Sequence, residues 1–206
     1  MCYSAEVSAG TFLFVSAVTT YLWIRNKGID RALAGILFFI GFMQAIEWGL
    51  WTNLDCNSVN KGLAFSIPIY LALQPVVINL LVWFYKAGWA SGYEWVGLFS
   101  LAYTGIVIWK NRNDYGSCVT LDTNKNLIWP GVANQDFEDQ LLRSVYYATM
   151  LYPLLTLKNS WFSATYTLFG AVSLWMFGET SSKSWPSLWC HFVNALAVLA
   201  IIRPAP

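Results

Sequence analysis

Polar side chains recur at helical spacing inside the long apolar segments of this sequence. Gln44, Glu47, Trp48 and Trp51 fall at positions i, i+3, i+4 and i+7, so they share one face of a helix. Glu47 is the one acid clearly inside an apolar run, and an acidic residue at the centre of a bilayer costs roughly 2.5–3.5 kcal/mol. Such a carboxyl group calls for a hydrogen-bond partner, a cation or a proton. Glu47 is therefore the centre of a candidate binding site.

Two later apolar segments carry polar stripes with the same spacing. Tyr146 and Tyr147 lie three and four residues after Arg143, and Cys190, His191 and Asn194 follow Ser187 in the same way. We expect these stripes to converge on one pocket with the Glu47 stripe. The candidate binding residues are Gln44, Glu47, Gln74, Tyr146, Tyr147, His191 and Asn194.

Three hypotheses account for this set of side chains. It is a structural or sensory polar network without catalysis, or a site that binds or translocates protons or a small solute. In the second case Glu47 accepts the proton or cation, and Tyr146 or His191 hydrogen-bonds it. The third hypothesis is a metal or redox enzyme whose ligands include Cys2, Cys190 and His191, because thiolate and imidazole suit zinc or copper. We carry the second hypothesis forward, which assigns no catalytic residue; metal and cofactor stay unknown.

The composition indicates a membrane protein. Hydrophobic residues make up 57% of the 206 residues and charged residues only 11%, whereas soluble domains carry about 25% charged residues. The net charge of +1, without a clustered basic face, excludes nucleic acid as a partner. The expected partners are the lipid bilayer and a small solute or proton, and a homo-oligomer stays open.

Apolar segments near the length of a membrane span, roughly 20 residues, alternate with short polar breaks. We predict one all-α domain over residues 1–206, a bundle of seven transmembrane helices. The segment 110–140 is too polar to cross lipid, so it forms a long extracytoplasmic loop between the fourth and fifth helices. The expected spans are 5–24, 32–51, 62–85, 92–109, 141–157, 161–177 and 186–202.

The charges around the first apolar segment predict its orientation. Arg25, Lys27 and Arg31 follow this segment, and no Lys or Arg precedes it. Positive residues favour the cytoplasmic side. The N-terminus is therefore expected outside the cytoplasm and the C-terminus inside it.

All four cysteines fall near the extracytoplasmic face in this topology, where disulfides persist. We predict two bridges, Cys56–Cys118 and Cys2–Cys190. Four cysteines allow three pairings, and four unpaired thiols are the alternative. A Cys2–Cys190 bridge would remove two ligands from the metal hypothesis.

Three short motifs and Pro153 resemble a known group of proteins. The opening Met1–Ala5, the Gln44–Trp48 motif with Trp51, and the Ser187–Phe192 motif look like those of an uncharacterised family of multi-pass membrane proteins. That family opens Met-Cys-Phe-Ser-Ala and usually has Gly where Trp48 stands and Phe where His191 stands. The resemblance carries no function. It implies that one constellation holds the residues Cys2, Gln44, Glu47, Trp51 and Cys190.

Overall fold

The computed structural model describes residues 4–114, 116–123, 125–130, 137–158, 162–165, 167–168 and 189–202. At 114, 137–140, 143 and 189–192 it describes the backbone alone. The described part is mostly helical, with seven α-helices. Their bounds are α1 Ala5–Arg25, α2 Asp30–Gly41, α3 Met43–Trp51, α4 Ser58–Phe84, α5 Tyr93–Asn111, α6 Phe137–Leu155 and α8 Trp189–Ile202. A 3-10 turn covers Arg112–Asp114, and the strands β1 Thr120–Leu121 and β2 Leu127–Ile128 pair as an antiparallel hairpin.

Three helical segments are long and apolar enough to cross a membrane. They are Ala5–Arg25, Asp30–Trp51 and Ser58–Phe84. Helices α5, α6 and α8 occupy three further segments in which we predicted a helix, over 92–109, 141–157 and 186–202. Most of the segment predicted at 161–177 lies outside the described residues.

Two boundaries differ from the sequence prediction. The helix expected over 32–51 is two helices, α2 and α3, that meet at Phe42 directly after Gly41. Glycine weakens a helix interior because, without a side chain, it loses more conformational freedom on folding than any other residue. Helix α6 begins at Phe137, inside the segment predicted as loop. Glu138 and Asp139 stand in its first turn, where acidic side chains favour the positive end of the helix dipole.

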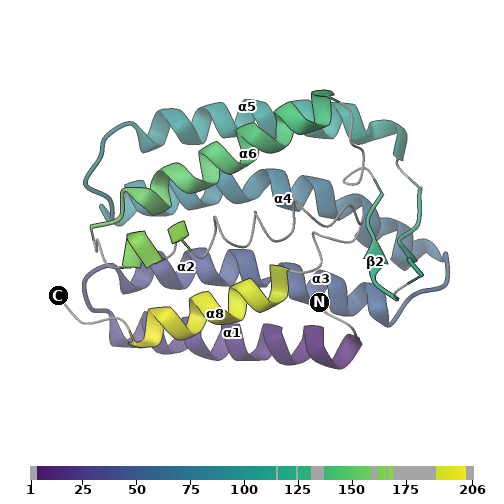
Figure 1. The fold of residues 1–206 in the computed structure, drawn as a ribbon, viewed down its shortest axis with the longest axis horizontal. Coiled ribbons are helices and arrows are strands. Elements are labelled where there is room, and N and C mark those ends of the chain that lie inside the picture. The colour runs from purple at the N-terminus through teal and green to yellow at the C-terminus, as the bar shows by residue number, and fades with distance from the viewer. Residues whose placement is uncertain are drawn as a thin grey trace.

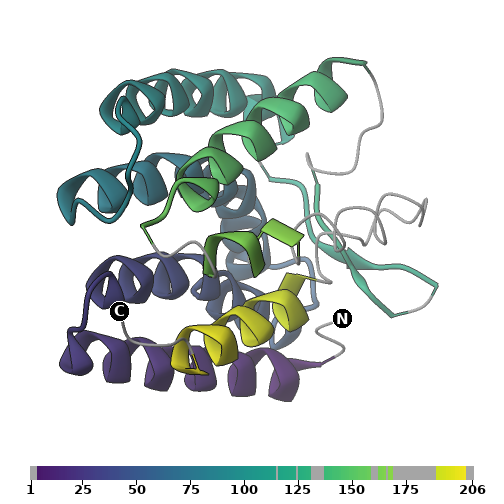
Figure 2. The same cartoon turned by 60° about the vertical axis from the view of Figure 1, so that its left-hand side comes forward.

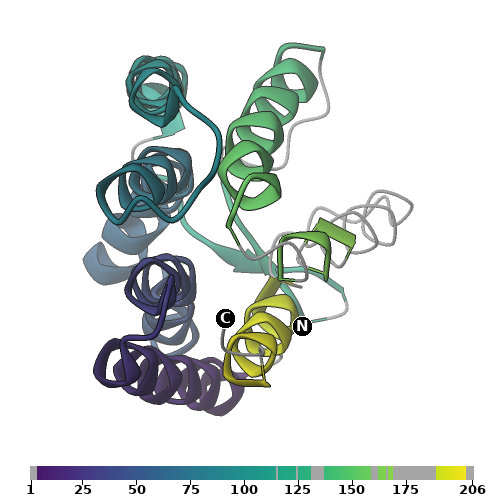
Figure 3. The same cartoon turned by 90° about the vertical axis from the view of Figure 1, so that its left-hand side faces the viewer.

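The helices lie side by side, and most of them begin and end at two opposite ends of the molecule. Figure 1 shows the hairpin at one end of the molecule, beside the beginning of α1 and the end of α3. We call this the hairpin end. The opposite end, where α1 and α8 finish, is the Arg25 end. Seen end-on, α1, α2, α4 and α5 form a row, and α6 and α8 lie on one side of it (Figures 2 and 3).

Apolar side chains form two main clusters inside this arrangement. The larger cluster joins α1, α2 and α8 to the last turns of α4 and α6, around Leu22, Leu37 and Leu196. The smaller cluster lies at the hairpin end, where Leu50 of α3 and Ile67 of α4 pack against the hairpin. The second cluster therefore joins the long loop to the helices around Glu47.

A buried ion pair holds the Arg25 end together. Arg25 Nε lies 2.7 Å from Asp30 Oδ2, and its Nη2 lies 2.8 Å from Oδ1. The same guanidinium donates to the carbonyls of Ala200 and Ile201, at 3.3 and 3.2 Å. Those carbonyls belong to the last turn of α8, which has no intrahelical partners for them. One arginine thus ties α8 to the turn between α1 and α2.

Candidate functional site

The side chain of Glu47 is buried in the described part of the chain. Its side chain is 1% exposed, and neither carboxyl oxygen has a hydrogen-bond partner among the described residues. Gln44 approaches the carboxyl group from the preceding turn of α3 without reaching hydrogen-bond geometry. No described basic residue forms an ion pair with Glu47. Buried polar groups are nearly always paired, so this exception needs an explanation.

Helix α1 places Ser8 at the level of Glu47. A Cβ on Gly41 would meet Val15 Cγ1 at 2.6 Å, so Gly41 and Val15 lie at the same height. Glu47 comes six residues after Gly41 and Ser8 seven residues before Val15, which is roughly 9–10 Å toward the hairpin end in both helices. The Ser8 hydroxyl is also buried and has no partner in the described part of the chain. The structure therefore adds Ser8 to the site.

Helix α8 contributes Asn194 to the same region. Its Nδ2 donates to Thr11 Oγ1 at 3.0 Å, across the contact between α8 and α1. Its Oδ1 is buried and unpartnered within the described residues. Thr11 is one turn from Ser8 on α1. Asn194 thus joins the site from a helix that is far from Glu47 in the sequence.

Trp51 supplies an unused donor. It lies one turn after Glu47 on α3, and its indole Nε1 is buried with no acceptor among the described residues. The unpaired groups of α1, α3 and α8 are thus three acceptor oxygens, one indole donor and one hydroxyl that can do either. Acceptors outnumber donors. A guest that fits these groups must carry hydrogen-bond donors or positive charge.

The hairpin covers the ends of α3 and α4. Val119, Leu127 and Trp129 are buried against Leu50 and Ile46 of α3. This cover packs next to the turns that carry Glu47 and Trp51. The hairpin therefore lies between these turns of α3 and the outside of the molecule at the hairpin end.

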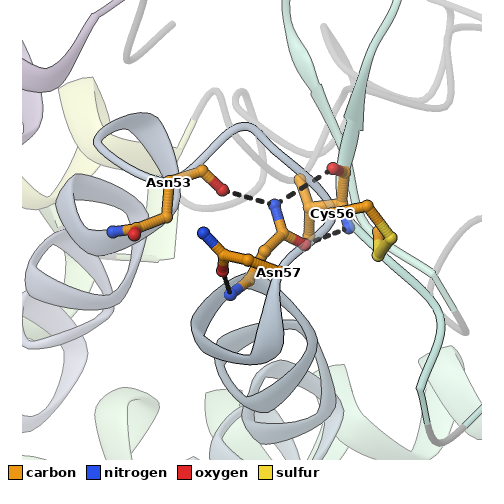
Figure 4. Close-up of a disulfide and its surroundings, with 6 residues drawn as sticks. Asn53, Cys56 and Asn57 are labelled. Atoms are coloured by element: carbon orange, nitrogen blue, oxygen red, sulfur yellow. Dashed lines mark hydrogen bonds between the residues drawn. A yellow bond between two sulfur atoms is a disulfide. The ribbon is translucent and has the colours of Figure 1, made fainter.

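A disulfide and an asparagine attach the hairpin to α4. The predicted Cys56–Cys118 disulfide is present. Beside it, Asn60 Nδ2 donates to the carbonyls of Asn53 and Val119, and its Oδ1 accepts from Val119 N at 2.9 Å. Figure 4 shows the disulfide with these hydrogen bonds next to Asn53 and Asn57. Asn60 was not among the predicted residues, because its role depends on a contact 59 positions along the chain.

Gln74 and the tyrosines of α6 form a separate contact. Tyr146 Oη donates to Gln74 Oε1, and the ring of Tyr147 lies edge-on to Tyr146 at 5.3 Å between centroids. This places three of the predicted site residues together, between α4 and α6.

This contact lies at a different depth from Glu47. A Cβ on Gly49 of α3 would meet Leu63 of α4 at 2.8 Å, so these two residues share a height. Gln74 is eleven residues further along α4, whereas Glu47 is two residues from Gly49. Gln74 is therefore roughly 10 Å or more nearer the Arg25 end. The single pocket that we expected divides into two polar regions.

The cysteine and histidine predictions fall outside the described side chains. They concern Cys2, Cys190 and His191, so the Cys2–Cys190 bridge and the metal hypothesis stay predictions. Within the part of the chain that the structure describes, no group of three or more His, Cys, Asp or Glu side chains is placed to hold a metal ion.

No protein-family model matches this sequence, and neither a curated protein nor a solved structure matches it.

Proposed function

We propose that this chain crosses the bilayer seven times, with its hairpin end extracytoplasmic, and binds a proton or a small donor-bearing solute at Glu47. One observation carries the proposal: a fully buried carboxyl group whose two oxygens have no hydrogen-bond partner among the described residues.

The surface of the helices favours a membrane location. Large apolar side chains are exposed on several helices; the exposed fraction is 67% for Leu13, 76% for Ile24 and 70% for Phe84. Soluble monomers rarely expose contiguous apolar patches of this kind. Lipid tails would cover these side chains, in agreement with the three helices that are long and apolar enough to span a membrane.

The energetics of the carboxyl group favour proton or cation binding. An ionised carboxylate buried without a partner carries a penalty of several kcal/mol. A proton removes the charge, and a bound cation compensates it. Either event would remove this charge penalty, so we expect the site to exchange one of them.

The closed hairpin determines how exchange would proceed. A solute that enters from the hairpin side must pass the cover made by Leu127 and Trp129. A proton can be relayed by hydroxyl groups such as Ser8 without moving that cover. Proton binding is therefore the simplest form of the function, and solute passage requires the hairpin to open.

A structural role for the polar residues is the second candidate. The Thr11–Asn194 hydrogen bond favours it, because that bond joins α1 to α8. It accounts for Asn194 Nδ2 but leaves Glu47 without a partner among the residues that the structure describes. The two candidates differ in what they expect when the carboxyl group is replaced.

The experiment uses the purified full chain in liposomes that contain a pH-sensitive dye. Proton flux is measured in wild type, Glu47→Gln and Glu47→Asp, with Glu94→Gln as a control that removes an acid from the start of α5. We expect Glu47→Gln to abolish the flux and Glu94→Gln to keep it. Infrared difference spectra across pH report the carbonyl stretch of the protonated acid. That band should disappear in Glu47→Gln.

Equal flux in wild type and Glu47→Gln would remove the carboxyl group from the mechanism. Infrared bands that are unchanged by Glu47→Gln would show that this residue does not exchange protons. Both results together would leave the structural candidate.

A further inference from the structure

A stripe of exposed residues runs along the side of α2 that faces away from α6 and α8. Arg31, Gly35, Phe38 and Phe42 follow one another at intervals of four, three and four residues, so they lie on one face. Phe38 is 45% exposed and Phe42 38%. Figure 3 shows α1 and α4 on either side of α2, and none of the segments drawn as ribbons covers this face.

Two cations lie at the Arg25 end of the stripe. Arg31 and Lys86 are exposed, and neither has a carboxylate partner within the described residues. The nearby Asp30 is occupied by Arg25, which it contacts through both oxygens. Arg31 is therefore not paired with Asp30, although Asp30 precedes it directly in the sequence.

Aromatic rings join the two cations. The guanidinium of Arg31 lies 5.4 Å from the ring centroid of Trp23. The Trp23 ring meets Tyr85 edge-on at 6.4 Å, and Lys86 follows Tyr85 at the end of α4. Tryptophan and tyrosine favour the boundary between lipid tails and headgroups. The cluster is thus placed where a headgroup would be.

Apolar rings line the rest of the stripe. Phe12 of α1 lies 6.5 Å from Phe38 and 5.9 Å from Phe42, between ring centroids. Tyr70 of α4 lies 5.7 Å from Phe42 on the other side. The Leu81 side chain of α4 packs over Gly35 in the middle of the stripe, where a Cβ would meet Leu81 Cδ1 at 2.9 Å. The result is an apolar face of α2 that is bordered by rings of both neighbours.

The length of the stripe matches one leaflet. Eleven residues separate Arg31 from Phe42, which is roughly 16 Å along a helix. Half of a hydrocarbon core of about 30 Å is about 15 Å. A lipid with its headgroup at Arg31 would end its chains near Phe42.

We propose that this face binds an anionic glycerophospholipid, with the phosphate between Arg31 and Lys86 and an acyl chain along Leu81, Phe38 and Phe42. Opposite charge selects the headgroup, and the exposed rings accept the chain. The site requires that the chain lies in a bilayer, but it does not depend on Glu47.

The test measures lipid binding to the purified full chain in neutral detergent by native mass spectrometry. Dioleoyl phosphatidylglycerol is compared with dioleoyl phosphatidylcholine, so that only the headgroup differs. We expect wild type to bind phosphatidylglycerol at least tenfold more tightly. Each cation near an anionic lipid contributes roughly a fivefold factor, so the double variant Arg31→Gln, Lys86→Gln should lose roughly 25-fold in phosphatidylglycerol affinity and keep its phosphatidylcholine affinity.

The matched control is the double variant Lys61→Gln, Lys125→Gln, which removes the same charge from exposed positions at the hairpin end. It should bind phosphatidylglycerol like wild type. An equal loss in both double variants would show a diffuse charge effect and overturn the site. Equal binding of the two lipids by wild type would also overturn it.

A second measurement does not require a variant. Wild type is photolabelled with phosphatidylglycerol that carries a reactive group on one acyl chain, and the labelled peptides are sequenced. Labels should fall within residues 30–42 or on the facing turns of α1 and α4. Labels found only elsewhere would overturn the proposal. Because Glu47→Gln should leave the labelling unchanged, failure of the lipid site and failure of proton binding are distinguishable.

Discussion

Replacing Glu47 with methionine separates a binding site from a structural network. A buried polar group that is left unsatisfied costs about 1–3 kcal/mol, and both oxygens of Glu47 are unpaired within the described residues. Methionine has a similar length, is flexible and has no oxygen to satisfy. The free energy of unfolding should therefore rise by about 1–3 kcal/mol in Glu47→Met. The variant should also lose the proton flux, because it has no carboxyl group.

Thermal unfolding in neutral detergent, followed by circular dichroism, measures this change. A chain of this size shifts by about 2–4 °C per kcal/mol, so a gain of about 2 kcal/mol raises the melting temperature by about 4–8 °C. Asn60→Leu is the control at the same end of the molecule. Asn60 is fully buried and its side chain makes hydrogen bonds to Asn53 and Val119, so this variant should melt below wild type.

The reasoning fails if Glu47→Met melts below wild type by an amount similar to that of Asn60→Leu. That result would mean that the carboxyl group has a partner in the folded protein and that its role is to stabilise the fold.

Three further predictions concern stability, each measured by the same thermal unfolding. Cys118→Ser removes a disulfide between positions 62 residues apart, and loop-closure entropy sets an upper bound of roughly 4 kcal/mol on the loss of stability. Wild type with reductant should melt at the same temperature as the variant. An unchanged melting temperature of wild type in reductant would contradict this prediction. Arg25→Gln leaves Asp30 buried without its cation and should lower the stability by about 3–5 kcal/mol. Adding Asp30→Asn should restore part of this stability. Strictly additive losses in the double variant would argue against the ion pair. Gly41→Ala places a Cβ 2.6 Å from the Val15 side chain and should lower the stability by about 1–3 kcal/mol. The control Gly10→Ala, whose Cβ would have nothing within 4 Å, should be neutral or slightly stabilising. Equal melting temperatures of the two variants would show that the Gly41 contact relaxes freely.

Part of the site could be read from spacing alone. The positions of Gln44, Glu47 and Trp51 on one helix face follow from their separation in the sequence. Ser8 and Thr11 are also three residues apart in an apolar segment, and the same rule could have found them. They were missed because serine and threonine in helices commonly bond the carbonyl one turn back, which gives them no distinct sequence signal.

The depth of each polar group could not be predicted in this way. Spacing says which side chains share a face, but not how far one helix is displaced along its neighbour. The close contacts at Gly41 and Gly49 set those displacements. They bring Ser8 to the level of Glu47 and leave Gln74 nearer the Arg25 end.

By itself, the sequence determined where the helices lie, that several are apolar enough for a membrane, and that Glu47 is an acid in an apolar segment. These properties depend on hydropathy and local spacing, which each segment carries within itself. Only the tertiary structure decided that the hairpin packs over α3 and that Glu47 remains unpaired among the described residues. Each of these depends on contacts between segments distant in the chain, because a side chain's partners and exposure are set by its neighbours in space.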